Sequence, residues 1–285
     1  MVTVRDAATV MLVRDVPGSG SGMEVFMLRR NLNSDFVGGA YVFPGGGVDE
    51  ADRHAELEAV CRGLSDDAAS ARLGIERGGL AFWVAAIREC FEEAGVLLAA
   101  SSHGPLALDD PVTADRFRLH RKAVDAGERR LVEVCVQEGL QLTVDRVHYF
   151  SHWITPVGPP RRYDTRFFVA AAPAGQEPLH DDRETIASLW VQPADALERH
   201  RRGGLDLILP TIRNLEAISR FERSADLLDA AARITDVPAI QPRIVRDEDG
   251  GTRILLPGDP GYDEAATRLP DGPMPGRPGG PSTDA

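Results

Sequence analysis

Apolar and polar positions near the start of the chain follow a pattern that predicts extended β-structure. Residues 7–13 and 24–28 are apolar and rich in β-forming side chains, and the glycines and serines between them are typical of a hairpin connection. Residues 38–47 follow as a short strand that leads into a glycine-rich turn. Further strands are expected at residues 148–156, 163–171, 187–191 and 253–256.

A helical pattern replaces the extended one in the middle of the chain. Residues 80–94 form the clearest predicted helix, and Gly95 stands directly after them, where a left-handed cap ends many helices. The acidic, alanine-rich segment 53–79 predicts one or two short helices, and 113–140 is helical again. Shorter helices are expected at residues 193–200 and, as one or two units, at 211–231.

Strands and helices that are mixed along a chain favour an α/β or α+β fold around one core. Residues 1–262 are therefore predicted to form a single domain, with insertions at about 53–79 and 103–145. The second insertion is helical, lies between strands and has no convincing Pro/Gly/Ser linker at its ends. The Pro- and Gly-rich tail, 263–285, has little to bury and is expected to be disordered.

The composition narrows the choice of partners. With 44 acidic and 32 basic residues, the net charge of −12 argues against a nucleic-acid backbone or an anionic membrane as the main partner, because like charges repel. A small phosphorylated ligand stays compatible with this charge if a metal cation or an arginine cluster screens it. No apolar run approaches the ~20 residues that a membrane span needs.

The cysteines favour a reducing compartment. Cys61, Cys90 and Cys135 are odd in number, lie far apart and include no Cys-x-x-Cys pair, so neither a disulfide framework nor a structural zinc site is expected. The first residues carry acidic and basic side chains with no apolar segment after them, which is unlike a signal peptide. A cytoplasmic location is therefore expected.

Three carboxylates are grouped on one face of the predicted helix 80–94. At 100° per residue, Glu89, Glu92 and Glu93 fall within an arc about 100° wide, where they repel one another unless a cation lies between them. Hard oxygen ligands of this kind select Mg²⁺ or Mn²⁺. The alternative is a solvated acidic face. The strongly apolar remainder of the helix favours a site, because it leaves the acidic side as the one exposed face of a buried helix.

These carboxylates belong to a stretch, 88–96, that resembles the second half of the Nudix box, G-x5-E-x7-R-E-U-x-E-E-x-G-U with U apolar. Counted from Gly46, the first half has Asp52 where the family has Glu, and the arginine expected at position 60 stands at 88, after an insertion of 28 residues. Motifs at residues 43–52, 153–156, 161–168 and 256–259 are similar to the Nudix subgroup that includes the mammalian peroxisomal coenzyme A diphosphatase.

The resemblance implies a Nudix-type α/β/α sandwich with a mixed β-sheet and helical insertions. It also implies metal-dependent hydrolysis of a nucleoside diphosphate linked to another moiety, with coenzyme A or acyl-coenzyme A as the first substrate choice. NADH or ADP-ribose is an alternative, because Asp35 stands where coenzyme A-directed members carry arginine. A nucleotide sensor without catalysis is a second alternative. The partner is then a small-molecule nucleotide diphosphate, and a homodimer is one expected assembly, since Nudix relatives are often dimers.

The resemblance also suggests roles for single residues. Glu89, Glu92 and Glu93 are the implied ligands of Mg²⁺ or Mn²⁺, and Glu92 or Glu93 is the implied base acting on a metal-bound water. Arg88 is expected to orient the carboxylates, although an ordinary ion pair with Glu92 on the helix surface has a similar spacing.

Other candidates lie outside the helix. Gly45 and Gly46 are expected to let the backbone approach the metal and phosphates, because a Cβ there would intrude. The basic cluster around Asp164 either clamps a phosphate by forked hydrogen bonds or forms a structural Asp–Arg network. Its members are Arg161, Arg162 and Arg166, and the possible additional carboxylates are Asp52 and Glu184.

Overall fold

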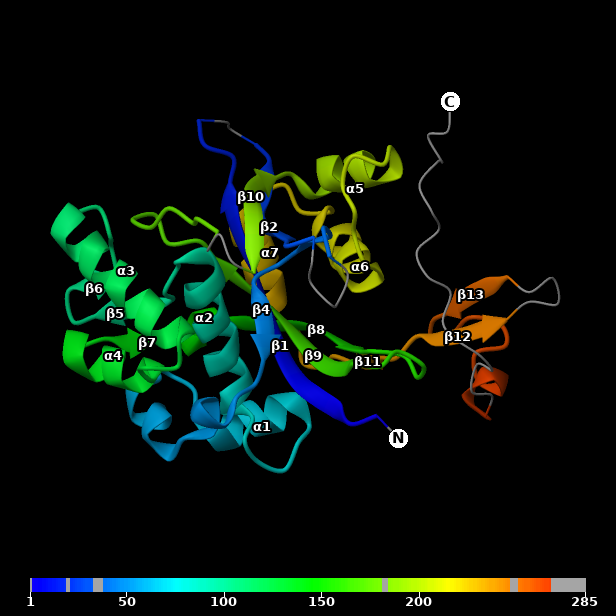
Figure 1. The fold of residues 1–285 in the computed structure, drawn as a ribbon, viewed down its shortest axis with the longest axis horizontal. Coiled ribbons are helices and arrows are strands. Elements are labelled where there is room, and N and C mark those ends of the chain that lie inside the picture. Colours follow the sequence, from blue (N-terminus) through cyan, green and yellow to red (C-terminus); the bar gives the residue numbers. More distant parts are fainter. Residues whose placement is uncertain (1, 19–20, 33–37, 181–183, 247–250, 268–285) are drawn as a thin grey trace.

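The computed structural model describes residues 2–18, 21–32, 38–180, 184–246 and 251–267. A mixed β-sheet lies at its centre, built from strands far apart in the sequence (Figure 1). Its strands are β1 (Val4–Asp15), β2 (Met23–Arg30), β3 (Tyr41–Val42), β4 (Gly45–Gly47), β8 (His148–Ile154), β9 (Arg162–Ala171), β10 (Thr185–Val191) and β11 (Ala239–Ile240). The order across the sheet is β10-β2-β1-β9-β8-β11, with β3 beside β2 and β4 beside β1.

Strand β1 shows why both faces of this sheet are covered. Val10 and Leu12 point into one apolar core and Met11 and Val13 into the other, because successive side chains of a strand alternate between faces. Helix α2 (Leu80–Ala94) packs in the first core, and helices α5 (Pro193–Arg201), α6 (Leu209–Ile218) and α7 (Ser224–Ala232) contribute to the second. The predicted α/β/α sandwich with a mixed sheet is confirmed.

Helix α2 is capped by side chains of another segment at its amino terminus and by a glycine at its carboxyl terminus. The carboxylate of Asp66 accepts a hydrogen bond from the Leu80 N–H at 2.9 Å, and the Ser70 hydroxyl accepts one from the Gly79 N–H at 2.9 Å. The helix ends at Gly95, which has a left-handed φ of 70° as predicted. Both amino-terminal caps come from the first insertion, in which η1 (Glu50–Arg53), η2 (Ala55–Val60) and α1 (Asp66–Leu73) succeed one another.

The second insertion is only partly helical. Helices α3 (Pro111–Asp125) and α4 (Leu131–Glu138) are separated at a turn where Gly127 has a φ of 67°, so 113–140 is not one helix. A small sheet of order β6-β5-β7 flanks these helices in the sequence. Its strands are β5 (Ala99–Ser101) and β6 (Gly104–Pro105) before α3, and β7 (Gln141–Leu142) after α4. Strands of two or three residues are too short to give a sequence pattern, which is why they were not predicted.

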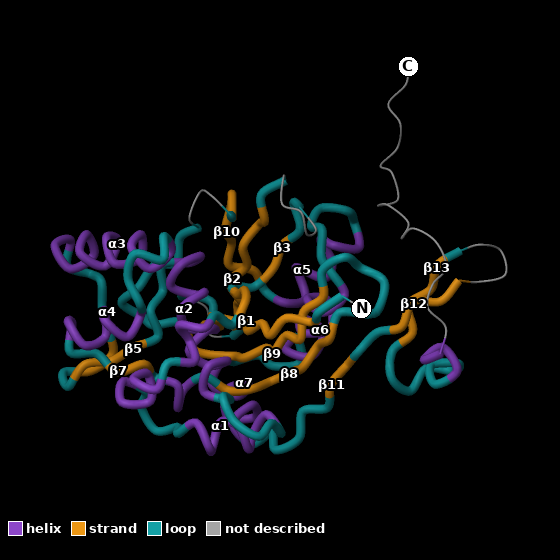
Figure 2. Tube along the Cα trace, turned by 60° about the horizontal axis from the view of Figure 1, so that its bottom comes forward, coloured by secondary structure: helices purple, strands orange, loops and turns teal. Residues whose placement is uncertain are grey.

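The carboxyl-terminal part of the described chain forms an arm. Strand β12 (Arg243–Arg246) pairs with β13 (Thr252–Leu255), so the predicted last strand lies in a hairpin and not in the central sheet. This hairpin projects from the body in both views (Figures 1 and 2). Within the predicted tail, η4 (Glu264–Thr267) is a short helix, and residues 268–285 lie outside the described residues. Among the described helices, none is long and apolar enough to cross a membrane.

Candidate active site

Arg88 lies at the centre of the candidate site, and its guanidinium binds three carboxylates. Nε and Nη2 donate to the two oxygens of Asp52, each at 2.9 Å. Nη1 donates to Glu89 Oε1 at 2.9 Å and to Glu92 Oε2 at 2.8 Å, and Nη2 also donates to the Gly47 carbonyl at 2.7 Å. These bonds occupy all five N–H groups of the guanidinium, so its orientation is fixed.

Burial distinguishes this arginine from an ion pair on a helix surface. Only 7% of Arg88 is exposed. Burial alone would lower its pKa, but the hydrogen bonds of Asp52 and the charges of the neighbouring carboxylates raise that pKa, and the guanidinium stays charged. The geometry therefore excludes an exposed ion pair on the helix surface, and the orienting role stays a prediction.

The first insertion does not separate Asp52 from the site. Asp52 lies 36 residues before Arg88, yet the two form a buried, bidentate pair because the insertion loops out and returns to α2. The backbone N–H of Asp49 donates to Asp52 Oδ2 at 2.8 Å and fixes the carboxylate from the other side. Asp52 thus supports Arg88, and both of its oxygens are already bonded.

The glycines of β4 bring the backbone against the carboxylate helix. The Gly45 N–H donates to Glu93 Oε2 at 2.9 Å. A Cβ on Gly46 would lie 2.5 Å from Glu89 Oε1, and a Cβ on Gly45 would lie 2.4 Å from the Thr9 hydroxyl in β1. Gly46 therefore allows the close approach of the backbone to the Glu89 carboxylate and Gly45 the close approach to β1, both at φ values outside the left-handed region.

The three helix carboxylates are in an environment that disfavours their charge. Burial raises the pKa of Glu89 to about 8 and that of Glu92 to about 7, and Arg88 opposes the rise in each case. Burial and the charge of Glu89 raise the pKa of Glu93 well above its ordinary value. An added cation would favour the charged form of all three carboxylates.

Two residues at the end of β2 and the start of β10 act on the same cluster. The charge of Glu184 raises the pKa of Glu93, and the charge of Arg30 lowers it. The Glu184 carbonyl accepts a hydrogen bond from the Asn31 N–H at 2.9 Å, which fixes it beside the end of β2. The structure therefore brings Glu184, predicted as an extra carboxylate, to the edge of the cluster.

The donor set suits a hard divalent cation. Each of Glu89, Glu92 and Glu93 has one oxygen held by a protein N–H, and no hydrogen bond from the described residues reaches the other oxygen. In this conformation the described part of the chain contains no group of three His, Cys, Asp or Glu side chains converging on one point. Arg88 draws Glu89 and Glu92 toward itself, so metal binding requires these two side chains to rotate.

The predicted arginine cluster on β9 has other partners. Arg162 donates to two backbone carbonyls of the preceding turn at 3.0–3.1 Å. Arg166 is buried and forms an ion pair with Asp164, which also bonds His152. Arg161 is exposed at the start of the strand. The contacts of Arg162 and Arg166 correspond to the structural alternative, and none of those described joins them to the helix carboxylates.

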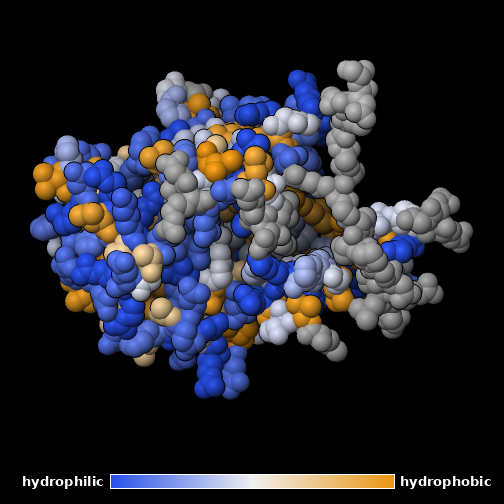
Figure 3. Space-filling model, in the orientation of Figure 1, coloured by the Kyte–Doolittle hydropathy of each residue, from blue (hydrophilic) through white to orange (hydrophobic). Residues whose placement is uncertain are grey.

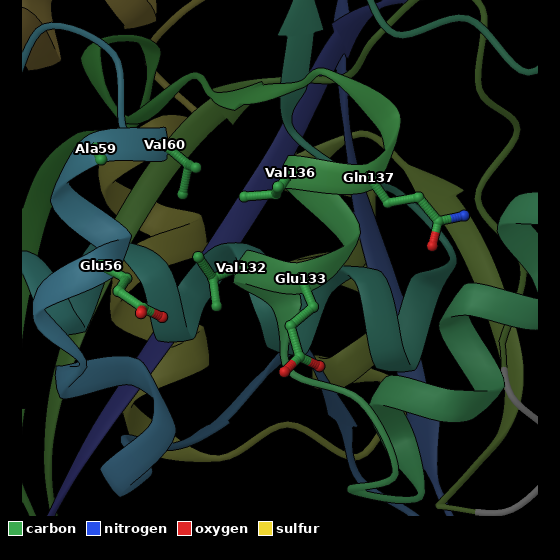
Figure 4. Close-up of a pocket in the computed structure, with 7 residues that line it drawn as sticks. All are labelled: Glu56, Ala59, Val60, Val132, Glu133, Val136 and Gln137. Carbon is green, nitrogen blue, oxygen red and sulfur yellow. The ribbon is translucent and has the colours of Figure 1, made fainter.

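An apolar groove of ≈ 510 Å³ lies elsewhere, between η2 and α4 (Figure 4). Ala59 and Val60 line it from η2, and Val132 and Val136 line it from α4. No residue of the carboxylate cluster contributes to this groove, so it is separate from the candidate site.

One residue of the second insertion could not be identified from the sequence. Arg121 in α3 donates from Nε to the Glu92 carbonyl at 2.8 Å. Its partner lies 29 residues away, so no local spacing could have linked the two. One sequence feature points to such a partner: the last turn of α2 contains no basic residue that could interact with the end of the helix.

Comparisons with known proteins bear on the family and the fold. The family model described as the NUDT19 Nudix domain matches residues 65–218. The chain is 30% identical to the acyl-coenzyme A diphosphatase NUDT19 of Gallus gallus, over 91% of this chain and 80% of that protein. It is 28% identical to the Homo sapiens protein of the same name, over 86% and 74%. The crystal structure of a NUDIX hydrolase from Alicyclobacillus acidocaldarius matches with a TM-score of 0.65 and 28% identity, over 80% of this chain and 97% of that one.

Proposed function

The chain belongs to the NUDT19 family of Nudix hydrolases, and from this membership we propose that it hydrolyses the diphosphate of coenzyme A and its acyl esters. The relatives from Gallus gallus and Homo sapiens are both named acyl-coenzyme A diphosphatases. The observation that supports catalysis is the carboxylate cluster of α2, in which Arg88 binds Glu89 and Glu92 and the β4 backbone binds Glu93.

We propose Mg²⁺ or Mn²⁺ as the metal and Glu89, Glu92 and Glu93 as its ligands. Their oxygens are hard donors, which these cations prefer. Bound there, the cation supplies charge neutralisation at the diphosphate and lowers the pKa of a water molecule. Arg88 remains paired with Asp52 while Glu89 and Glu92 rotate, because the bidentate bonds to Asp52 are separate from those that the glutamates use.

Hydrolysis needs a group that takes a proton from the attacking water. Glu93 suits this role because its Oε2 is fixed by the Gly45 N–H while Oε1 stays available. A bound cation would favour the charged form of this carboxylate, which is the form that accepts a proton. The water oxygen then bonds to one phosphorus, the bridging P–O bond breaks, and the leaving phosphate oxygen carries away the electron pair.

A substrate panel tests the proposal. The protein is incubated with Mg²⁺ or Mn²⁺ and with coenzyme A, acyl-coenzyme A esters, NADH, ADP-ribose or dinucleoside polyphosphates. We expect 3′,5′-ADP and a phosphopantetheine from the coenzyme A compounds, whereas release of AMP would instead favour NADH or ADP-ribose as substrate.

Variants connect the activity to the site. We expect Glu93→Gln to lose at least ~100-fold in kcat, the lower range for a removed general base. Glu216→Gln, in an exposed pair with Arg213 on α6, is the matched control and should keep full activity. Tight binding of an intact nucleotide with no turnover would instead identify a sensor, and the enzyme proposal would then be wrong.

A further inference from the structure

Helix α2 carries its acidic residues at the end where they are least stable. The partial negative charge of the helix dipole lies at the carboxyl terminus, so carboxylates there are disfavoured and cations are favoured. The last turn of α2 holds Glu92 and Glu93 and no basic side chain. Arg88, one turn earlier, already uses all its donors. A stabilising cation at this end has to come from another element.

Arg121 of α3 is that cation. Its Nε donates to the Glu92 carbonyl at 2.8 Å, and a Cβ on Gly95 would lie only 3.0 Å from its Nη1. The guanidinium therefore lies directly over the last turn of α2, where it satisfies a carbonyl that the helix leaves without an internal partner. A residue of the second insertion thus completes the helix that carries the candidate ligands.

The same guanidinium reaches a second segment. Nη2 of Arg121 donates to the Leu179 carbonyl at 3.1 Å, and the Leu179 N–H donates to the Ala94 carbonyl at 2.9 Å. Leu179 belongs to the 172–180 loop, which follows β9. The side chain of Gln176 joins this loop to the backbone of residue 97 by bonds of 2.9 and 3.0 Å.

These contacts place one side chain between the last turn of α2, with Glu92 and Glu93, and the 172–180 loop. A loss of the guanidinium would leave the end of α2 joined to this loop only by the Leu179–Ala94 and Gln176–Leu97 bonds. Shifts of about 1 Å at reacting groups can reduce rates by ~100-fold, so such a bridge matters for catalysis.

We propose that Arg121 is a positioning residue, through which the second insertion holds Glu92 and Glu93 in the arrangement needed for metal binding and hydrolysis. The proposal rests on the proposed function for its kinetic part. Arg121 touches neither substrate nor metal in this role and acts through the backbone of α2 and of the 172–180 loop.

Metal binding and kinetics of Arg121→Met test the proposal. We expect Mn²⁺ binding, measured by calorimetry on the full chain without substrate, to weaken by about 10-fold, the lower range for groups that orient metal ligands. The value of kcat should fall by a similar factor, while KM for the diphosphate substrate changes little. Arg118→Met is the matched control, because Arg118 lies on the same helix in an exposed pair with Asp115. It should match the unaltered protein in both measurements.

Two outcomes would overturn the proposal. In the first, Arg121→Met has a lower Tm but keeps the Mn²⁺ affinity and kcat of the unaltered protein, so the bridge is purely structural. If Arg121→Met fails to fold, Arg121→Lys decides, because an ammonium lacks the planar fork that serves two carbonyls. Arg121→Lys should then bind Mn²⁺ more weakly, and unchanged binding is the second overturning outcome. A failure of the proposed substrates would leave the Mn²⁺ measurement intact, so the two failures are distinguishable.

Discussion

At the scale of single residues, the site depends on a glycine, Gly46, as much as on its charged side chains. A Cβ on Gly46 would overlap the Glu89 carboxylate, so an added methyl group would displace that carboxylate from its position beside Arg88. Two positions in the same strand offer a matched comparison. A Cβ on Gly47 would meet its nearest atom, in Asp49, only at 4.0 Å.

We expect Gly46→Ala to lose about 10- to 100-fold in kcat/KM, because displaced ligands cost that much in metal sites. Gly47→Ala should keep the activity, since it adds the same methyl group to open space. Activity assays with Mn²⁺ and circular dichroism of both variants check this. Equal activity in the two variants would show that Glu89 adjusts without consequence.

The sequence could predict the part of the site that is local in the chain. The spacing of Glu89, Glu92 and Glu93 places them on one helical face, and no knowledge of other elements is needed for that. The partners of the β9 arginines could not be predicted in this way. A group of charges along a strand does not reveal whether its side chains meet a ligand or, as for Arg166 and Asp164, each other.

At the scale of elements, α2 combines a buried apolar stripe with a cluster of carboxylates whose charge is disfavoured. Burial raises the pKa of Glu89 to about 8 and of Glu92 to about 7, from an ordinary 4.5. Between 4.5 and about 8 the folded protein therefore holds more protons than the unfolded chain. The stability from these groups is present below pH 4.5 and is lost as pH rises through about 7 to 8.

Divalent metal should reverse this loss, because it binds the deprotonated carboxylates. We expect the increase in Tm on adding Mn²⁺ to grow as pH rises from 4.5 to about 8. Thermal unfolding with and without Mn²⁺ across this range measures the effect. In Glu89→Gln the dependence should become weaker, and an increment independent of pH in the unaltered protein would contradict the expectation.

The elements also show where sequence patterns stop being informative. The helix over 80–94 and its glycine cap could be predicted because apolar spacing and cap chemistry are local. Its amino-terminal caps, Asp66 and Ser70, come from the insertion that interrupts the family motif, so the interruption is part of the support of the helix. The break between α3 and α4 lies at Gly127, whose left-handed φ is a local signal that the helical composition of 113–140 obscures.

At the scale of the whole molecule, the net charge of −12 is compatible with a polyanionic substrate because of where some of the charge lies. Hydrophilic side chains cover much of the face shown in Figure 3. The carboxylates of Asp52, Glu89, Glu92 and Glu93 are instead buried or nearly so, where a cation can neutralise them. A diphosphate bound there then experiences a local electrostatic potential that the net charge does not describe. Net charge alone therefore could not identify the ligand.

The carboxyl-terminal arm offers a test of how much of the molecule the reaction needs. The β12–β13 ladder is internal to the arm, and Arg243 stacks on Tyr262 at 3.7 Å within it. Strand β11 is different, because it pairs with β8 at the edge of the central sheet and Ile240 packs against the second core. Three truncated variants, which end at Thr267, Gln241 and Pro238, separate the contribution of the arm from that of β11.

We expect the chain that ends at Gln241 to keep the hydrolytic activity of the one that ends at Thr267, with a slightly lower Tm from the lost packing of Leu256 on the second core. The chain that ends at Pro238 also lacks β11 and bares the edge of β8, so it should aggregate at lower concentration. Steady-state kinetics and light scattering on the three chains measure both effects. If the chain ending at Gln241 stays folded but loses activity, the arm contributes to the site, and the carboxylate cluster with its insertions is not sufficient for hydrolysis.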